Sequence, residues 1–238
     1  MQKSQIKSKE RVAERGEVFT AEREVKAMCD LVKEQCEDIH ARFLEPACGD
    51  GNFLAEILRR KLESVKKQYK KSSYEYELNS VVAIMSIYGV DIMMDNVIAC
   101  RERMFEIWNK EYTKNCKKDA NDETREVVKY VLSLNIVLGN ALSMMCVDEK
   151  QRDTDEPIIF PEWTFPQNNF LCQRKDYRFD VLLKEHPDEN MYAEQFSIFS
   201  DDVMGTENWI IDPITNELTP KPVREFDSIH YRRVNENG

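Results

Sequence analysis

The chain has 238 residues, of which 42% are hydrophobic and 33% charged, with only 7 Gly and 8 Pro, a composition that excludes collagen-like and disordered chains. This length suits one α/β domain. The net charge of −10 is uneven, because residues 1–80 hold 16 Lys/Arg and 15 Asp/Glu whereas residues 81–238 hold 18 and 29. Non-specific affinity for nucleic acid depends on basic contacts with phosphates. The overall charge of this chain therefore cannot supply affinity for nucleic acid. A local basic patch or a partner subunit would have to supply that affinity.

The seven cysteines form no CxxC pair, and with only three histidines they form no cluster of zinc-site spacing. No metal site is therefore expected. Residues 1–16 are polar and lack the apolar core of a signal peptide, and no run of 18 apolar residues occurs. The sequence predicts a cytoplasmic protein with reduced thiols and no membrane segment.

The predicted elements begin after a polar N-terminal arm, residues 1–19. Apolar residues at helical spacing predict an amphipathic helix from Thr20 to Cys36. A short strand follows at residues 43–44, then a glycine turn and a long helix whose apolar face runs over residues 53–69. Within this helix, residues 59–71 carry seven basic side chains and one acidic one. A solvated outer face is the favoured interpretation of that run, with a phosphate-binding patch as the alternative.

Further along, a second strand is predicted at residues 87–92, a helix from an N-cap at Asp95, another helix at 124–133 and a third strand at 135–142. Strands alternating with helices predict an α/β fold with a doubly wound, mostly parallel sheet. Residues 148–176, with prolines and aromatics, are expected to form an ordered loop or insertion. A fourth strand is predicted at 177–183, a helix near 191–202 and an irregular C-terminal extension at 201–238.

The segment EPACGDGNFL (45–54) holds the most specific chemical signal. Gly49 and Gly51 stand between a predicted strand and a helix, where backbone N–H groups can bind a carboxylate or phosphate. The segment matches neither GxxxxGK[ST] nor GxGxxG, so it carries neither a Walker nucleotide motif nor a dinucleotide fingerprint.

EPACGDGNFL resembles the S-adenosylmethionine (SAM) motif of class I methyltransferases, in the form found in N6-adenine DNA methyltransferases of restriction–modification systems. Three further segments follow in that family's order over residues 11–183: RGEVFT (15–20), YGVDI (88–92) and LGNAL (138–142). The resemblance implies a Rossmann-like methyltransferase domain over residues 20–200 with SAM as cofactor. The cofactor-binding residues that it implies are Phe19, Thr20, Glu45, Pro46, Ala47, Cys48, Gly49, Gly51, Asp91, Ile92, Asn140 and Ala141.

The resemblance also implies individual roles. The RGEVFT element would touch the methionine part of SAM, Asp91 would accept hydrogen bonds from the ribose hydroxyls, and Asn140 would accept one from the adenine amino group. Each residue type also has a purely structural interpretation. Thr20 and Asp50 suit helix capping, Asp91 and Asn140 suit turns, and Cys48 suits a buried filler better than a nucleophile.

The family's catalytic tetrapeptide, (N/D)PP(Y/F), follows its fourth strand, and its polar group, proline carbonyl and aromatic ring hold the flipped base. The corresponding stretch here is FDVLLKEHPDEN (179–190). It aligns Glu185, His186 and Pro187 with the first three positions, and Asp188 where the family has a ring that stacks on the base. Glu185 could replace the Asn or Asp as acceptor, whereas an exposed loop without a catalytic role is the alternative.

The sequence therefore leads to the hypothesis of a SAM-dependent enzyme that methylates adenine N6 in DNA. A second hypothesis is a catalytically weak or inactive SAM-binding subunit, because only about fifty residues follow the fourth predicted strand. Such a subunit would need a partner chain, a second modification or specificity subunit, for catalysis and DNA recognition. A third possibility is methylation of RNA or of a protein amine or amide.

Overall fold

The computed structural model describes residues 20–166, 170–183, 205–206, 208–211 and 217–237. Its helices are α2 (Glu22–Leu31), α3 (Lys33–Glu37), α4 (Asn52–Tyr69), α5 (Ser73–Met85), α6 (Met94–Cys116), α7 (Asp122–Asn135), α8 (Phe179–Leu182) and the 3-10 helices η1 (Lys117–Asp119) and η2 (Tyr231–Glu236). Its strands are β1 (Phe43–Glu45), β2 (Ile87–Asp91), β3 (Ile136–Leu138), β4 (Met145–Val147), β5 (Asp153–Pro157), β6 (Ile159–Thr164), β7 (Leu171–Arg178), β8 (Gly205–Thr206), β9 (Trp209–Ile211), β10 (Leu218–Pro220), β11 (Arg224–Glu225) and β12 (Ile229–His230).

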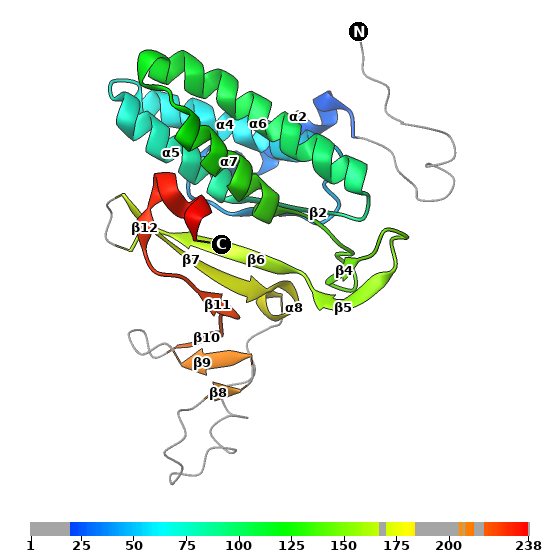
Figure 1. Cartoon of the computed structure of the whole chain (residues 1–238). Coiled ribbons are helices and arrows are strands. Elements are labelled where there is room, and N and C mark those ends of the chain that lie inside the picture. The colour runs from blue at the N-terminus through cyan, green and yellow to red at the C-terminus, as the bar shows by residue number, and fades with distance from the viewer. Residues whose placement is uncertain (1–19, 167–169, 184–204, 207, 212–216, 238) are drawn as a thin grey trace.

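The three predicted strands β1, β2 and β3 form one parallel sheet in that order. The central strand, β2, is buried along its whole length. The layer formed by α2 and α4–α7 lies on one side of this sheet, and the β6–β7 hairpin lies on the other (Figure 1). The fold is thus mixed α/β. Beyond this parallel sheet, the described strand pairs are antiparallel.

The helical layer supplies most of the core. Leu54, Leu58 and Val65 lie on the apolar face of α4 and are completely buried, as their helical spacing predicts. Helix α5 was not predicted, and the reason lies in its surroundings. Because it is buried on nearly all sides, its apolar residues show no clear helical period.

Of the two predictions for residues 148–176, an ordered loop or an insertion, the loop is wrong, because β5, β6 and most of β7 lie there. The inward positions of β7 include two charged residues, Arg174 and Asp176, which form a buried ion pair with Nε to Oδ1 at 2.7 Å. Charges at inward positions conceal the alternation that identifies a strand. The pairing of β6 with β7 therefore could not be read from hydropathy.

The prediction of a fourth parallel strand at residues 177–183 is also wrong. β7 ends at Arg178 antiparallel to β6, and the next four residues form α8. Phe179 packs edge-to-face on Phe160, with ring centroids 5.3 Å apart, and both rings belong to a second core cluster with Tyr88 and Val90 of β2. This apolar segment therefore covers a face of the sheet and does not extend its edge.

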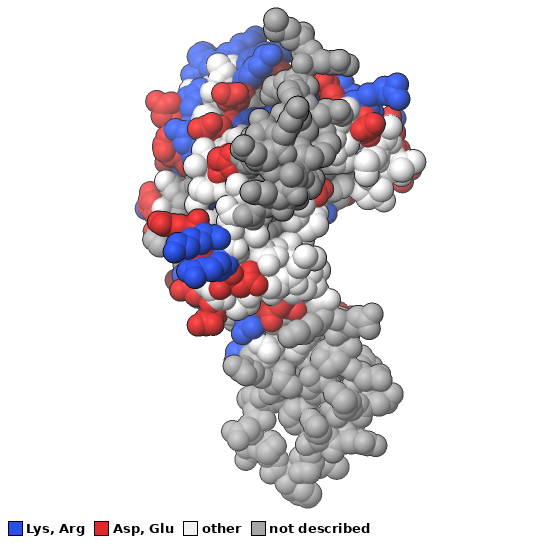
Figure 2. Space-filling model, turned by 90° about the vertical axis from the view of Figure 1, so that its right-hand side faces the viewer, with Lys and Arg blue, Asp and Glu red and all other residues white. Residues whose placement is uncertain are grey.

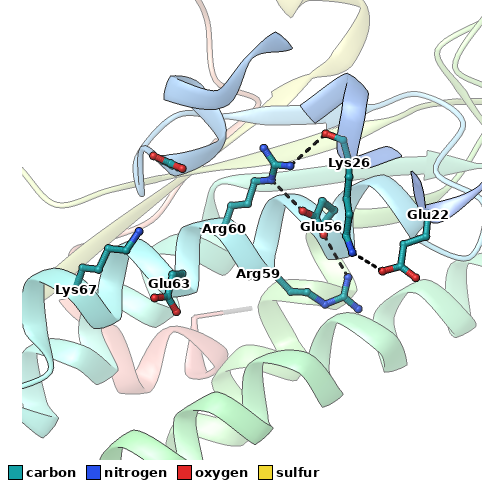
Figure 3. A pocket seen from close by; sticks show the side chains of 8 residues that line it. Glu22, Lys26, Glu56, Arg59, Arg60, Glu63 and Lys67 are labelled. Carbon is teal, nitrogen blue, oxygen red and sulfur yellow. Dashed lines mark hydrogen bonds and ion pairs between the residues drawn. The ribbon is translucent and has the colours of Figure 1, made fainter. Parts of the chain in front are cut away.

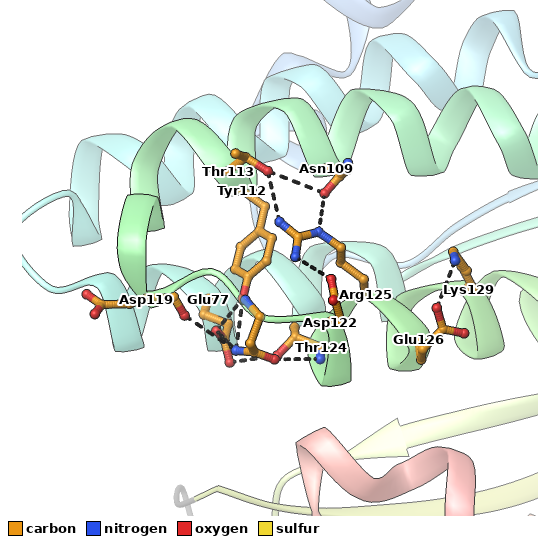
Figure 4. Close-up of polar contacts among 11 residues, drawn as sticks. Glu77, Asn109, Tyr112, Thr113, Asp119, Asp122, Thr124, Arg125, Glu126 and Lys129 are labelled. Carbon is orange, nitrogen blue, oxygen red and sulfur yellow. Dashed lines mark hydrogen bonds and ion pairs between the residues drawn. The ribbon is translucent and has the colours of Figure 1, made fainter.

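The C-terminal segment returns to the domain. β11 and β12 both pair with β7, and η2 packs against α7. Tyr231 of η2 is fully buried and donates its hydroxyl hydrogen to Glu77 Oε1 at 2.6 Å. Glu77 also accepts bonds from Tyr112 and Thr124 (Figure 4), as well as from Asn121 and Arg232. One buried carboxylate thus joins α5, α6, α7 and η2.

Lys61 departs from the solvated face predicted for residues 59–71, because it is completely buried. Its ammonium donates to the carbonyl oxygens of Asp38 and Ala41 at 2.6 Å each and of Ile39 at 3.2 Å. Three donors thus meet three acceptors. Burial lowers the pKa of Lys61 to about 8, so the charged form with three donors prevails at neutral pH.

Replacing Lys61 with methionine is expected to lower the free energy of unfolding by about 3 kcal/mol, because the chain before β1 loses its partners for three carbonyl groups. Urea denaturation measures the loss. Lys67→Met, on the exposed side of the same helix, is the matched control and should shift the value by less than about 0.5 kcal/mol. Equal effects of the two substitutions would contradict this role for Lys61.

Candidate functional site

The glycine turn joins β1 to α4, and two of its residues have a left-handed backbone conformation. Gly49 has φ +53° and Gly51 has φ +84°, a region that favours glycine. Gly51 N donates to the Cys48 carbonyl oxygen at 2.8 Å, and Cys48 N donates to the Val90 carbonyl oxygen at 2.9 Å. Gly51 is the N-cap of α4, and among the described residues no side-chain bond to this end of the helix is found. The first N–H groups of α4 therefore face the turn without a side-chain acceptor.

Close packing leaves no room for a side chain at Gly51. A Cβ atom there would lie 2.6 Å from the Cys100 Sγ atom of α6. Cys48 and Cys100 are both buried beneath the turn, and the pKa of the Cys48 thiol is raised, first by its hydrogen bond with Cys100 and then by burial. Cys48 therefore stays a thiol at neutral pH, in agreement with the filler interpretation.

Asp91 ends β2 and contacts the glycine turn directly. Its Oδ2 accepts a hydrogen bond from Gly49 N at 2.9 Å, and its Oδ1 accepts from Met93 N at 2.8 Å and from Asn96 Nδ2 at 3.2 Å. The two segments predicted to share a cofactor are therefore in hydrogen-bond contact. Asp91 also fulfils the alternative role, because it fixes the turn after its own strand.

Asn140 follows β3, and its environment matches the turn interpretation. Its side-chain oxygen accepts from Leu142 N at 3.1 Å, and its Nδ2 donates to Asp153 Oδ1 at 2.9 Å. Gly139 N donates to the Asp91 carbonyl oxygen at 3.0 Å, which brings the ends of β2 and β3 together. Asn140 thus lies at the predicted edge, with the oxygen assigned to adenine already engaged in a local turn.

Thr20 lies next to the first turn of α4, at the glycine turn. Its carbonyl oxygen accepts a bond from Asn52 Nδ2 at 3.5 Å. Thr20 does not cap the first helix, because Ala21 is the N-cap of α2 and forms no side-chain cap bond. Phe19 lies outside the described residues, as do Glu185, His186 and Pro187.

The other predicted residues sit around this edge. Glu45 is half-buried, and burial raises the pKa of its carboxyl group. Pro46 and Ala47 are exposed, while Ile92 and Ala141 are partly buried directly after β2 and β3. Apart from Thr20, which precedes α2, the described cofactor candidates therefore lie at the carboxyl ends of the three parallel strands or in the segments that directly follow them.

Sequence reasoning missed two features of this edge. The first is Arg103 of α6, which forms a bidentate ion pair with Asp50, so that Asp50 pairs with a neighbouring helix and does not cap α4. The second is apolar exposure, because Leu142 is 95% exposed and Met94 51% exposed, just after β3 and β2. Both side chains are therefore accessible for contact with a ligand at this edge.

The basic run of α4 does not form a uniformly positive surface. Arg60 pairs with Glu56 and Asp30, and Arg59 lies 3.7 Å from Glu56. A shallow cleft of 280 Å³ on this helix is lined by four acidic and four basic residues (Figure 3). Lys/Arg and Asp/Glu also alternate on the face shown in Figure 2. These pairings agree with a solvated face, the interpretation that the sequence favours.

No family model, curated protein or solved structure gives a significant match to this chain. Among the described residues, no group of three or more His, Cys, Asp or Glu side chains is arranged to hold a metal. Within the same residues, none of the helices combines the length and apolarity needed to cross a bilayer. Any assignment of function must therefore rest on the residues of the site.

Proposed function

We propose that this chain binds SAM at the carboxyl edge of β1, β2 and β3 and belongs to a system that methylates adenine N6 in DNA. The observation that carries the proposal is the bond from Gly49 N to Asp91 Oδ2 at 2.9 Å. It places the glycine turn against an acidic residue at the end of the neighbouring parallel strand. A ligand at such an edge meets backbone N–H groups and a carboxylate together.

Each part of SAM finds suitable chemistry there. The uncapped N-terminus of α4 suits the carboxylate of the methionine part. The Asp91 carboxylate suits a vicinal diol, once a ribose exchanges for part of its present bonds. Ile92 and the exposed Met94 and Leu142 suit the faces of an adenine ring. In this proposal β1–β3 form one half of a Rossmann-like, doubly wound sheet.

The adenine-N6 specificity rests on the resemblance of the four segments quoted above. Catalysis by this chain alone would depend on Glu185, His186 and Pro187, with Asp188 in place of an aromatic ring. A carboxylate at that position cannot stack on a flipped base and would repel its phosphate. The solo enzyme therefore requires a different way to hold the base.

The second candidate function, a SAM-binding subunit that needs a partner chain, is favoured by the β1 edge. Among the described residues β1 pairs only with β2, and Leu44 is 39% exposed. A pocket of 740 Å³ opens beside it, lined among others by Leu44, Phe160 and Phe179. An open strand edge next to an apolar pocket is suited to receive further chain.

Transfer of labelled methyl groups from SAM separates the two functions. The enzyme hypothesis predicts label in adenine of unmethylated DNA with this protein alone. The subunit hypothesis predicts label only after the products of neighbouring genes are added. Label in RNA or protein but not in DNA would contradict both and support the third possibility that the sequence left open.

A further inference from the structure

Arg103 connects two segments of the proposed SAM site although it belongs to neither of them. Its guanidinium donates from Nη1 to Asp50 Oδ1 at 3.1 Å and to Asn52 Oδ1 at 2.7 Å, and from Nη2 to Asp50 Oδ2. Asn52 in turn donates from Nδ2 to the Thr20 carbonyl oxygen at 3.5 Å. A chain of hydrogen bonds therefore runs from α6 through the glycine turn to the segment before α2.

Arg103 and Cys100 act on the turn from the same face of α6, since they are three positions apart on one helix. Cys100 lies beneath Gly51, where a Cβ would come within 2.6 Å of its sulfur. Arg103 holds the two residues on either side of Gly51. Helix α6 thus fixes both the depth of the turn and the direction of its side chains.

The bidentate ion pair between the Arg103 guanidinium and Asp50 also has an electrostatic effect on the site. Without Arg103, Asp50 would be an uncompensated carboxylate in the glycine turn, two positions before the first residue of α4. The side chains of Asp50 and Arg103 are each only 18% exposed, so water screens that charge weakly. An uncompensated carboxylate would repel a ligand carboxylate at the same place.

We propose that Arg103 is a positioning residue for SAM, which holds the glycine turn and the Thr20 segment in the binding conformation and neutralises Asp50. This inference rests on the proposed SAM binding. It assigns no contact between Arg103 and the cofactor. A bidentate pair fixes geometry in a way that a single ammonium cannot.

The test compares SAM affinity, by calorimetry, and melting temperature for the wild type, Arg103→Met, Arg103→Lys and Arg101→Met. Arg101 is the matched control, because it lies on the same helix and donates three bonds to the Ile136 and Ser133 carbonyls, away from the turn. We expect Arg103→Met to weaken SAM binding by about tenfold or more, Arg103→Lys to weaken it less, and Arg101→Met to change it by less than about threefold.

A purely structural role would lower the melting temperature of Arg103→Met without changing the SAM affinity of the folded protein. Wild-type affinity in Arg103→Met, or equal losses in Arg103→Met and Arg101→Met, would overturn the inference while leaving the proposed function intact. Failure of the wild type itself to bind SAM would instead overturn the proposed function, and the positioning role with it. Partial recovery of affinity in the double variant Asp50→Asn, Arg103→Met would support the neutralising role.

Discussion

Replacing Glu77 with leucine is expected to lower the free energy of unfolding by about 3 to 5 kcal/mol. The substitution leaves a partly buried arginine head group, two tyrosine hydroxyls and a threonine hydroxyl without their shared acceptor. It also removes the ion pair with Arg232, whose Nε lies 2.6 Å from Glu77 Oε1 and which anchors η2 to the helical layer. Urea denaturation followed by circular dichroism measures the effect.

Glu63→Leu is the matched control for this change. Glu63 lies on α4, is 54% exposed in its side chain and makes only a distant pair with Lys66 at 3.8 Å. Its substitution should change stability by less than about 0.5 kcal/mol. A loss below about 1 kcal/mol for Glu77→Leu would contradict the role assigned to this carboxylate.

The same carboxylate predicts how stability depends on pH. Burial alone raises the pKa of Glu77, but the hydrogen bonds from Arg232, Tyr112 and Tyr231 outweigh it and lower the pKa below its usual value. A lowered carboxyl pKa gives stability that is complete above the unfolded value of about 4.3 and is lost as the pH falls further. The stability difference between the wild type and Glu77→Gln should therefore narrow below about pH 4.

Replacing Gly51 with alanine is expected to weaken SAM binding by about a hundredfold. Alanine at φ +84° is strained, and its Cβ would lie 2.6 Å from the Cys100 sulfur. Both effects push the turn away from α6 and redirect the N–H groups at the start of α4. Calorimetric titration with SAM measures the loss.

Two companion variants separate the causes. Cys100→Ala leaves Gly51 in place and should weaken SAM binding clearly less than Gly51→Ala does, because it removes one buried contact without straining the backbone of the turn. The double variant Gly51→Ala, Cys100→Ala relieves the close contact but keeps the strained φ, so its binding should remain weak. Wild-type affinity in Gly51→Ala would show that the turn conformation does not matter for binding.

The parts of the fold that the sequence predicts correctly are those with regular apolar patterns. β1, β2, β3 and the helices α4, α6 and α7 lie close to their predicted positions, because each has a buried stripe or a short buried run between turn residues. The sequence pattern did not predict α5 or the β6–β7 hairpin, for two different reasons. α5 is buried on nearly all sides and so shows no clear helical period, whereas β7 carries Arg174 and Asp176 at inward positions.

The candidate site likewise contains residues that the sequence predicts and one that it does not. The glycine turn and Asp91 were predictable, because short motifs with fixed chemistry identify them and parallel strands bring their ends to one edge. Arg103 was not, because nothing in its local sequence distinguishes it from the other exposed-looking basic residues of α6. Only the crossing of α6 over the turn brings its guanidinium to Asp50, a residue 53 positions earlier in the chain.

The most direct test of the account is a calorimetric titration of the purified wild-type protein with SAM, with Gly51→Ala as the comparison. The account predicts saturable one-site binding with a Kd on the order of micromolar, lost or strongly weakened in the variant. Circular dichroism on the same samples establishes that both proteins are folded. An absence of binding heat at several temperatures in folded wild-type protein would contradict the central claim, that the glycine turn and Asp91 form a SAM site.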